Sequence, residues 1–112
     1  MGMKMGPTDF ASACSFERNR MIAEYANASG KSEVATLINM ANLSSEQKQL
    51  VMSAIDAALT DAFYTILLAI DGSCSLGHTQ QSFTLSDSDG NVIANGDGRL
   101  EVAAWEAFQS NQ

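Results

Sequence analysis

The most regular pattern in the chain is a hydrophobic repeat with helical spacing over residues 44–72. Apolar residues recur every three or four positions, which is the spacing of one face of an α-helix. Ser44 and Gln47 stand three residues apart at its start, as a capping box requires, and Gly72 supplies a helix end. The pattern predicts a long, apolar, central helix on which the other elements pack.

Two shorter helices are expected before it. The first covers residues 8–28, where Thr8 or Asp9 provides a capping side chain and Pro7 prevents an earlier start. The second covers residues 32–41, in which four apolar residues form one stripe. Both helices are amphipathic, so each is expected to bury one face.

The period of the pattern changes after a loop at residues 72–80. Residues 81–98 alternate apolar and polar positions around the turn-forming sequence Ser88-Asp89-Gly90-Asn91, which predicts a β-hairpin. Residues 95–98, "NGDG", form a second turn, and residues 99–109 return to helical spacing. A hairpin alone is not stable, so it must pack on the helices or pair with another chain.

These elements predict a mainly helical α+β fold, with three helices around a long central helix, a C-terminal β-hairpin and a short terminal helix. The 112 residues are expected to form a single domain, residues 1–112, in which residues 1–7 are disordered.

The two adjacent turns invite comparison with a calcium-binding loop. If Gly98 takes the glycine position of an EF-hand loop, Ile93 and Ala104 stand where the two strongest ligands are required. The EF-hand reading therefore fails. A looser site from Asp87, Asp89 and Asp97 remains an alternative to the simpler interpretation that turns select Asp, Asn and Gly.

The sequence contains few of the residue patterns that catalytic sites require. His78 is the single histidine, and neither a G-x-S-x-G turn nor a phosphate-binding glycine motif is present. One histidine with two distant cysteines is too few for a zinc site. We therefore expect no catalytic residues, no metal and no cofactor, and we expect that the protein is not an enzyme.

The charge is distributed unevenly. Residues 1–48 contain five basic and five acidic residues, whereas residues 49–112 contain one arginine against eight acidic residues, so the whole net charge of −7 lies there. Such a surface repels nucleic acid and favours a basic protein partner. The sequence shows no signal peptide and no run of 18 apolar residues. We therefore expect neither membrane insertion nor export, and we expect a cytoplasmic location.

Three segments follow one another between about residues 44 and 108: a capped helix ending in "LLAIDG", the hairpin "FTLSDSDGNVIA" and the segment "GRLEVAAWEAF". This layout resembles small uncharacterised bacterial proteins of mobile-element type, some of which are similar to immunity proteins that neutralise toxins. The resemblance implies a protein-binding role. Because it lies in a layout and not in a motif, it assigns no functional residue.

The sequence thus predicts a small acidic, non-enzymatic protein-binding module, with neutralisation of a basic toxin as its sharpest form. Tyr64, Trp105 and Phe108 are aromatic candidates for an interface. Two alternatives remain: a ligand-binding or enzymatic domain with a pocket between the long helix and the hairpin, and a homodimer joined through hairpin edges. The expected partner-binding residues are Asp87, Asp89, Asp97, Glu101, Trp105 and Glu106.

Overall fold

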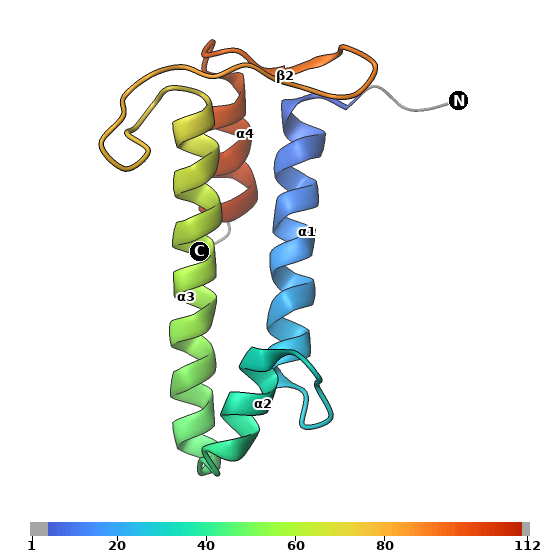
Figure 1. Ribbon diagram of the computed structural model, residues 1–112, viewed down its shortest axis with the longest axis vertical. Coiled ribbons are helices and arrows are strands. Elements are labelled where there is room, and N and C mark those ends of the chain that lie inside the picture. The colour runs from blue at the N-terminus through green and yellow to red at the C-terminus, as the bar shows by residue number, and fades with distance from the viewer. Residues whose placement is uncertain (1–4, 111–112) are drawn as a thin grey trace.

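The computed structural model describes residues 5–110, and this part of the chain contains four α-helices and one antiparallel hairpin (Figure 1). The mainly helical α+β fold is therefore confirmed. The disorder expected for residues 1–7 falls partly on residues 1–4, which lie outside the described residues. The elements are α1 (Pro7–Ala26), α2 (Glu33–Met40), α3 (Ser45–Ile70), β1 (Leu85–Ser86), β2 (Val92–Ala94) and α4 (Arg99–Phe108).

The start of α1 differs from the prediction. Pro7 is the first residue of the helix and Gly6 is its N-cap, so Pro7 begins the helix instead of preventing it. Proline is well suited to this position because its fixed φ matches the helix and the first-turn N–H has no helical partner. Asp9 is not the cap residue; from the first turn, its carboxylate accepts a hydrogen bond of 3.0 Å from the Gly6 N–H.

Serine side chains cap both α2 and α3. The Ser32 hydroxyl accepts a hydrogen bond from the Ala35 N–H at the start of α2. Ser44 and Gln47 form the expected reciprocal capping box at the start of α3. Gly72 follows α3 with a φ of +79°, the left-handed conformation that commonly ends a helix.

The hairpin is shorter than the alternating pattern indicates. Its strands contain two and three residues, and their pairing is irregular between Leu85 and Ser86. Phe83 was expected in the first strand, but its N–H donates to the carbonyl of Ile70 at the end of α3. The segment before β1 is therefore attached to the long helix, which leaves few residues for strand pairing.

The core lies where α1, α3 and α4 meet, beneath the hairpin (Figure 1). Leu67 of α3 and Leu100 of α4 are its largest fully buried side chains. Phe63 and Phe108 stack at its edge with ring centroids 5.9 Å apart. The remaining buried members are mostly small: Ala11, Ala94, Ala103 and Ala104. A core of this composition is small for a chain of this length.

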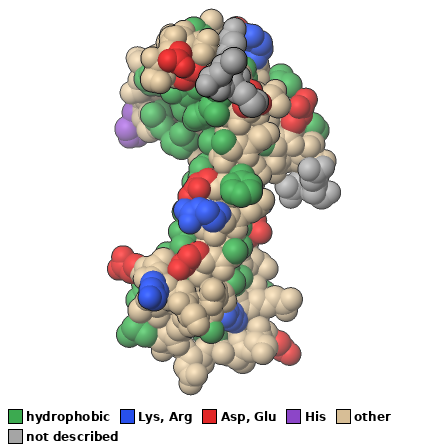
Figure 2. Space-filling view, turned by 90° about the vertical axis from the view of Figure 1, so that its right-hand side faces the viewer, with side chains coloured by type: hydrophobic (Ala, Val, Ile, Leu, Met, Phe, Trp, Pro, Cys, Tyr) green, Lys and Arg blue, Asp and Glu red, His purple; other side chains and the backbone are tan. Residues whose placement is uncertain are grey.

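Much of α3 is not covered. Figure 2 shows a broad end joined by a narrow waist to a smaller end, so long stretches of helix have few neighbours. By length and composition α3 could cross a membrane, and only 11% of its most apolar window is buried. The sequence argument against a membrane span, which relied on the lack of an unbroken apolar run, is therefore not supported by the length and composition of α3. The long helix runs the length of the fold (Figure 1), but only its last turns are enclosed.

Candidate functional site

Helix α4 has one buried and one exposed face. Its buried face carries Leu100, Ala103, Ala104 and Phe108, which pack into the core. On the opposite face Val102 is 57% exposed and Trp105 is 52% exposed. Three residues apart on a helix, these two apolar side chains are neighbours. The exposed tryptophan beside the exposed valine gives α4 a small apolar outer surface, whereas its other large apolar side chains are buried.

Acidic residues surround this apolar pair. Helical geometry places Glu101 on the Trp105 side and Glu106 on the Val102 side, and both are exposed. Asp97 precedes the helix and lines the same hollow as Glu101, Val102 and Glu106, opposite Pro7 and Thr8 of α1. We call the five residues Asp97, Glu101, Val102, Trp105 and Glu106 the α4 face. It brings together four of the six predicted partner-binding residues.

The other two predicted residues lie elsewhere. Asp87 and Asp89 occupy the turn of the hairpin, which extends over the N-terminal end of α1, whereas residues 95–98 lead directly into α4 (Figure 1). The Asp87 carboxylate accepts hydrogen bonds from the N–H groups of Asp89 and Asn91 and from the Asn91 side-chain amide. These bonds, the amide's foremost, lower the pKa of Asp87.

Asp97 is also engaged within its own turn. Its carboxylate accepts hydrogen bonds from the Arg99 N–H at 3.1 Å and from the Arg99 guanidinium at 2.7 Å. The backbone bond and then the guanidinium lower the pKa of Asp97. The two turns therefore use their carboxylates as local backbone acceptors. Among residues 5–110, no group of three His, Cys, Asp or Glu side chains is placed to hold a metal ion.

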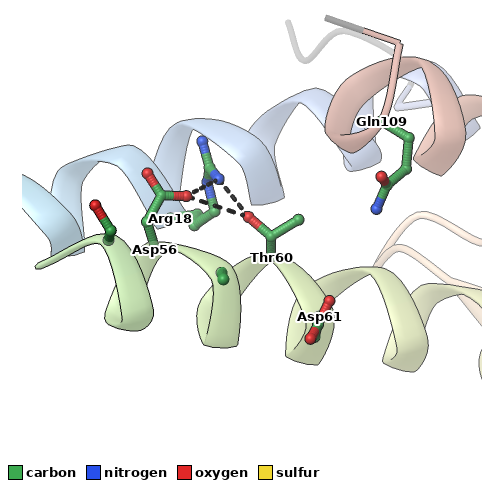
Figure 3. A pocket seen from close by; sticks show the side chains of 7 residues that line it. Arg18, Asp56, Thr60, Asp61 and Gln109 are labelled. Carbon is green, nitrogen blue, oxygen red and sulfur yellow. Dashed lines mark hydrogen bonds and ion pairs between the residues drawn. The ribbon is translucent and has the colours of Figure 1, made fainter. Parts of the chain in front are cut away.

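A second candidate is a polar hollow between α1 and α3, beside the C-terminal end of α4 (Figure 3). Arg18 projects from α1 across to α3, where its guanidinium donates to Asp56 at 3.0 Å and to the Thr60 hydroxyl. Asp61 and Gln109 lie along the same hollow. This cross-helix cluster was not predicted, because Arg18 and Asp56 are 38 residues apart and no local pattern links them.

The polar groups of the hollow chiefly bind one another. The Arg18 guanidinium also lies 6.0 Å from the ring centroid of Phe108, so this one side chain links α1 to both α3 and α4. It donates as well to the neighbouring Asn19. Its Nε is buried with no hydrogen-bond partner. An arginine held by an aspartate and a threonine joins helices, and this cluster accounts for the charged centre of the hollow. Ser53 and Asp61 also line the hollow. His78, the one histidine, is in the exposed loop after α3.

The three aromatic candidates separate clearly. Phe108 is buried in the core and Tyr64 is half-buried against it, so packing occupies both. Trp105 alone among the three is exposed. Val102 was not predicted for the surface, although the helical spacing that places Leu100 inward places Val102 outward.

Comparisons of this chain with protein-family models, with curated proteins and with solved structures give no match. The likeness to immunity proteins therefore stays a prediction, and the site has to be interpreted from its own geometry.

Proposed function

We propose that this chain is a small non-enzymatic protein-binding module that docks a basic protein through the α4 face. The observation that carries the proposal is the half-exposed Trp105 beside Val102, with carboxylates on both sides. Tryptophan is among the residues that contribute most binding energy in interfaces, because it buries a large rigid surface at small entropic cost. Neutralisation of a basic toxin is the role that such a surface would suit best.

Electrostatics supports the choice of partner. Three of the five residues of the α4 face are acidic, and Arg99, the nearby cation, is paired with Asp97. The net charge of −7 adds a long-range field that attracts a basic protein before contact. Charges at the rim of an interface mainly change the association rate and its salt dependence. The complex is therefore expected to form quickly and to weaken as ionic strength rises.

The test is affinity capture from the native host with three baits at low and moderate salt. The wild-type bait is expected to retain a basic protein, and Trp105→Ala is expected to lose it. Phe16→Ala is the matched control, because Phe16 is also an exposed aromatic residue but lies on α1. Calorimetry with the purified partner would then show a loss of binding by about 100-fold for Trp105→Ala.

Two outcomes would count against the proposal. One is recovery of no protein by the wild-type bait at either salt concentration. The other is a partner that Trp105→Ala and Phe16→Ala retain equally, since the binding surface would then lie outside the α4 face. Circular dichroism of each bait shows beforehand that the helices are intact.

A further inference from the structure

The chain exposes more surface than a protein of its mass usually does. Its accessible surface is 7301 Å², against about 6,000 Å² for a typical folded monomer of its mass. Its radius of gyration is 16.5 Å, against about 13 Å for a compact domain of this length. The accessible surface also includes the terminal residues outside 5–110. If these residues are removed from the calculation and each is assumed to be fully exposed, an excess of roughly 600 Å² remains.

That excess is comparable to one side of a protein–protein interface. Without the allowance for the termini it is roughly 1,300 Å², and a standard interface buries about 800 Å² on each partner. The amount of unburied surface is therefore what one protomer of a stable dimer would present. Its location then decides what kind of partner would cover it.

A continuous apolar ridge runs along the uncovered side of α3. Its members are spaced by four residues, which places them on one ridge inclined to the helix axis. Leu50 at one end is 73% exposed and Ile66 at the other is 46% exposed. The three residues between them are exposed alanines. We call the five residues Leu50, Ala54, Ala58, Ala62 and Ile66 the α3 ridge.

We propose that the α3 ridge is a homodimer interface in which it packs against the same ridge of a second copy of this chain. When ridges of this spacing interdigitate, two helices cross at about −50°, and small residues at the crossing let the axes approach closely. A two-fold axis near Ala58 would place the three alanines where the two helices cross. Leu50 and Ile66 would then pack against the sides of the partner helix. Figure 1 shows α3 at one edge of the molecule, where a second copy can approach.

The charge distribution favours a second copy over a lipid bilayer. The apolar part of α3 carries Asp56 and Asp61 near its middle, and each would cost about 3 kcal/mol at the centre of a membrane. Asp56 is moreover paired with Arg18 of α1, so insertion of α3 would break a bond between helices. In a dimer Asp56 can keep its pair with Arg18. Asp61 is exposed and lines a shallow hollow with Ala58, Ala62 and Ile66, so it borders the α3 ridge, where its carboxylate can still reach water. The acidic α4 face lies at the far end of the fold from Leu50, which limits repulsion between the copies.

Sedimentation equilibrium of the purified chain over a micromolar concentration series tests this interface. The wild type is expected to sediment at twice its mass of 11.9 kDa. Ala58→Arg places a charge at the crossing, so it is expected to weaken the dimer by at least about 100-fold. Ala23→Arg is the matched control, because Ala23 is an exposed alanine on the outward face of α1. Ala54→Arg repeats the test should Ala58→Arg fail to fold.

Three results would overturn the proposal. They are a wild type that is monomeric throughout the series, a dimer that Ala58→Arg and Ala54→Arg leave intact, and co-sedimentation of the wild type with phosphatidylcholine–phosphatidylglycerol vesicles that removes the dimer. The second result would move the interface elsewhere, for example to the hairpin edges. Trp105→Ala is expected to stay dimeric, so the fates of the α3 ridge and of the α4 face are separable.

Discussion

The carboxylate of Asp71, directly after α3, accepts a hydrogen bond of 3.0 Å from the backbone N–H of Glu101 in the first turn of α4. Its second oxygen accepts from the Gly96 N–H at 3.1 Å. Asp71 is 3% exposed, and Gly98, the N-cap of α4, has no side chain to offer. The end of one helix therefore caps the start of another that is 30 residues away in the chain.

Replacement of Asp71 should destabilise the fold strongly. Asp71→Ala leaves two part-buried N–H groups without their acceptor, and we expect a loss of about 2 kcal/mol in the free energy of unfolding. Asp71→Asn retains one acceptor oxygen and is expected to lose about half as much. Urea denaturation measures both values. The exposed Asp89→Ala serves as control, and a control loss as large as that of Asp71→Ala would refute a capping role.

Arg18 should stabilise the protein more by packing than by charge. Its side chain is 19% exposed, whereas that of Asp56 is 50% exposed, so water screens the pair. Arg18→Ala is expected to cost about 2 kcal/mol, and Arg18→Met about half of that, because methionine keeps the aliphatic contact with the core.

A double-mutant cycle with Asp56→Ala separates these contributions. The coupling energy between Arg18 and Asp56 is expected to stay below about 1 kcal/mol. A coupling of several kcal/mol would show that the ion pair, and not the packing, holds α1 against α3.

Local signals in the sequence predicted the elements well. The Ser44–Gln47 capping box and the glycine after α3 each involve residues at most three positions apart, and each is present. Helical spacing also places Leu100, Ala104 and Phe108 on one face of α4, and all three are buried. Such features are encoded within one turn of helix, so they are visible without knowledge of tertiary structure.

Contacts between distant segments were not predictable in the same way. Asp71 looked like part of a helix stop, and nothing local shows that it caps residues 30 positions later. Arg18 lies among the charged residues Glu17 and Arg20, and such a local sequence is typical of a solvated face. Its position four residues after Cys14, which packs on the core, was the available signal that it faces inward.

The α4 face could be predicted only in part from the sequence, for a related reason. Glu101, Trp105 and Glu106 lie within six residues on one helix, so the sequence could group them. Asp87 and Asp89 were grouped with them by charge alone. These two residues lie in the turn of the hairpin, whereas α4 follows its other end. Charge alone does not show that the turn of the hairpin lies away from the α4 face.

Glu24 should make stability depend on pH. The Ser32 hydroxyl and then the Lys31 N–H hydrogen-bond its carboxylate and lower its pKa from the ordinary value of 4.5. A lowered folded pKa means that the stabilisation is present above pH 4.5 and is lost as pH falls through the folded pKa. Glu24→Gln is therefore expected to lower the melting temperature at neutral pH, with a difference that shrinks in acid.

Thermal melts of wild type and Glu24→Gln from pH 7 to about pH 3 measure this difference. Glu106→Gln, which removes an exposed carboxylate from α4, is the control and is expected to follow the wild type. A gap between wild type and Glu24→Gln that is the same at every pH would contradict the role given to the Glu24 carboxylate.

Calcium should leave the melting temperature unchanged at low millimolar concentration. The Asp87 and Asp97 carboxylates already accept hydrogen bonds within their turns, and the two turns lie at opposite ends of the hairpin. A calcium ion requires six to eight oxygen ligands at about 2.4 Å, which would mean breaking these bonds. Melts with calcium chloride, and with sodium chloride at equal ionic strength, test this; a rise of several degrees specific to calcium would revive a metal site.

Leu100 and Trp105, which point to opposite sides of α4, should respond differently to truncation. Leu100 is fully buried, and Leu100→Ala is expected to cost about 3 kcal/mol through lost apolar burial and the cavity left behind. Trp105 is half-exposed, so Trp105→Ala is expected to change stability by about 1 kcal/mol or less. Urea denaturation of the two variants at equal concentration gives both values. If Trp105→Ala were as damaging as Leu100→Ala, the tryptophan would belong to the folding core, and its exposure could not be ascribed to a binding surface.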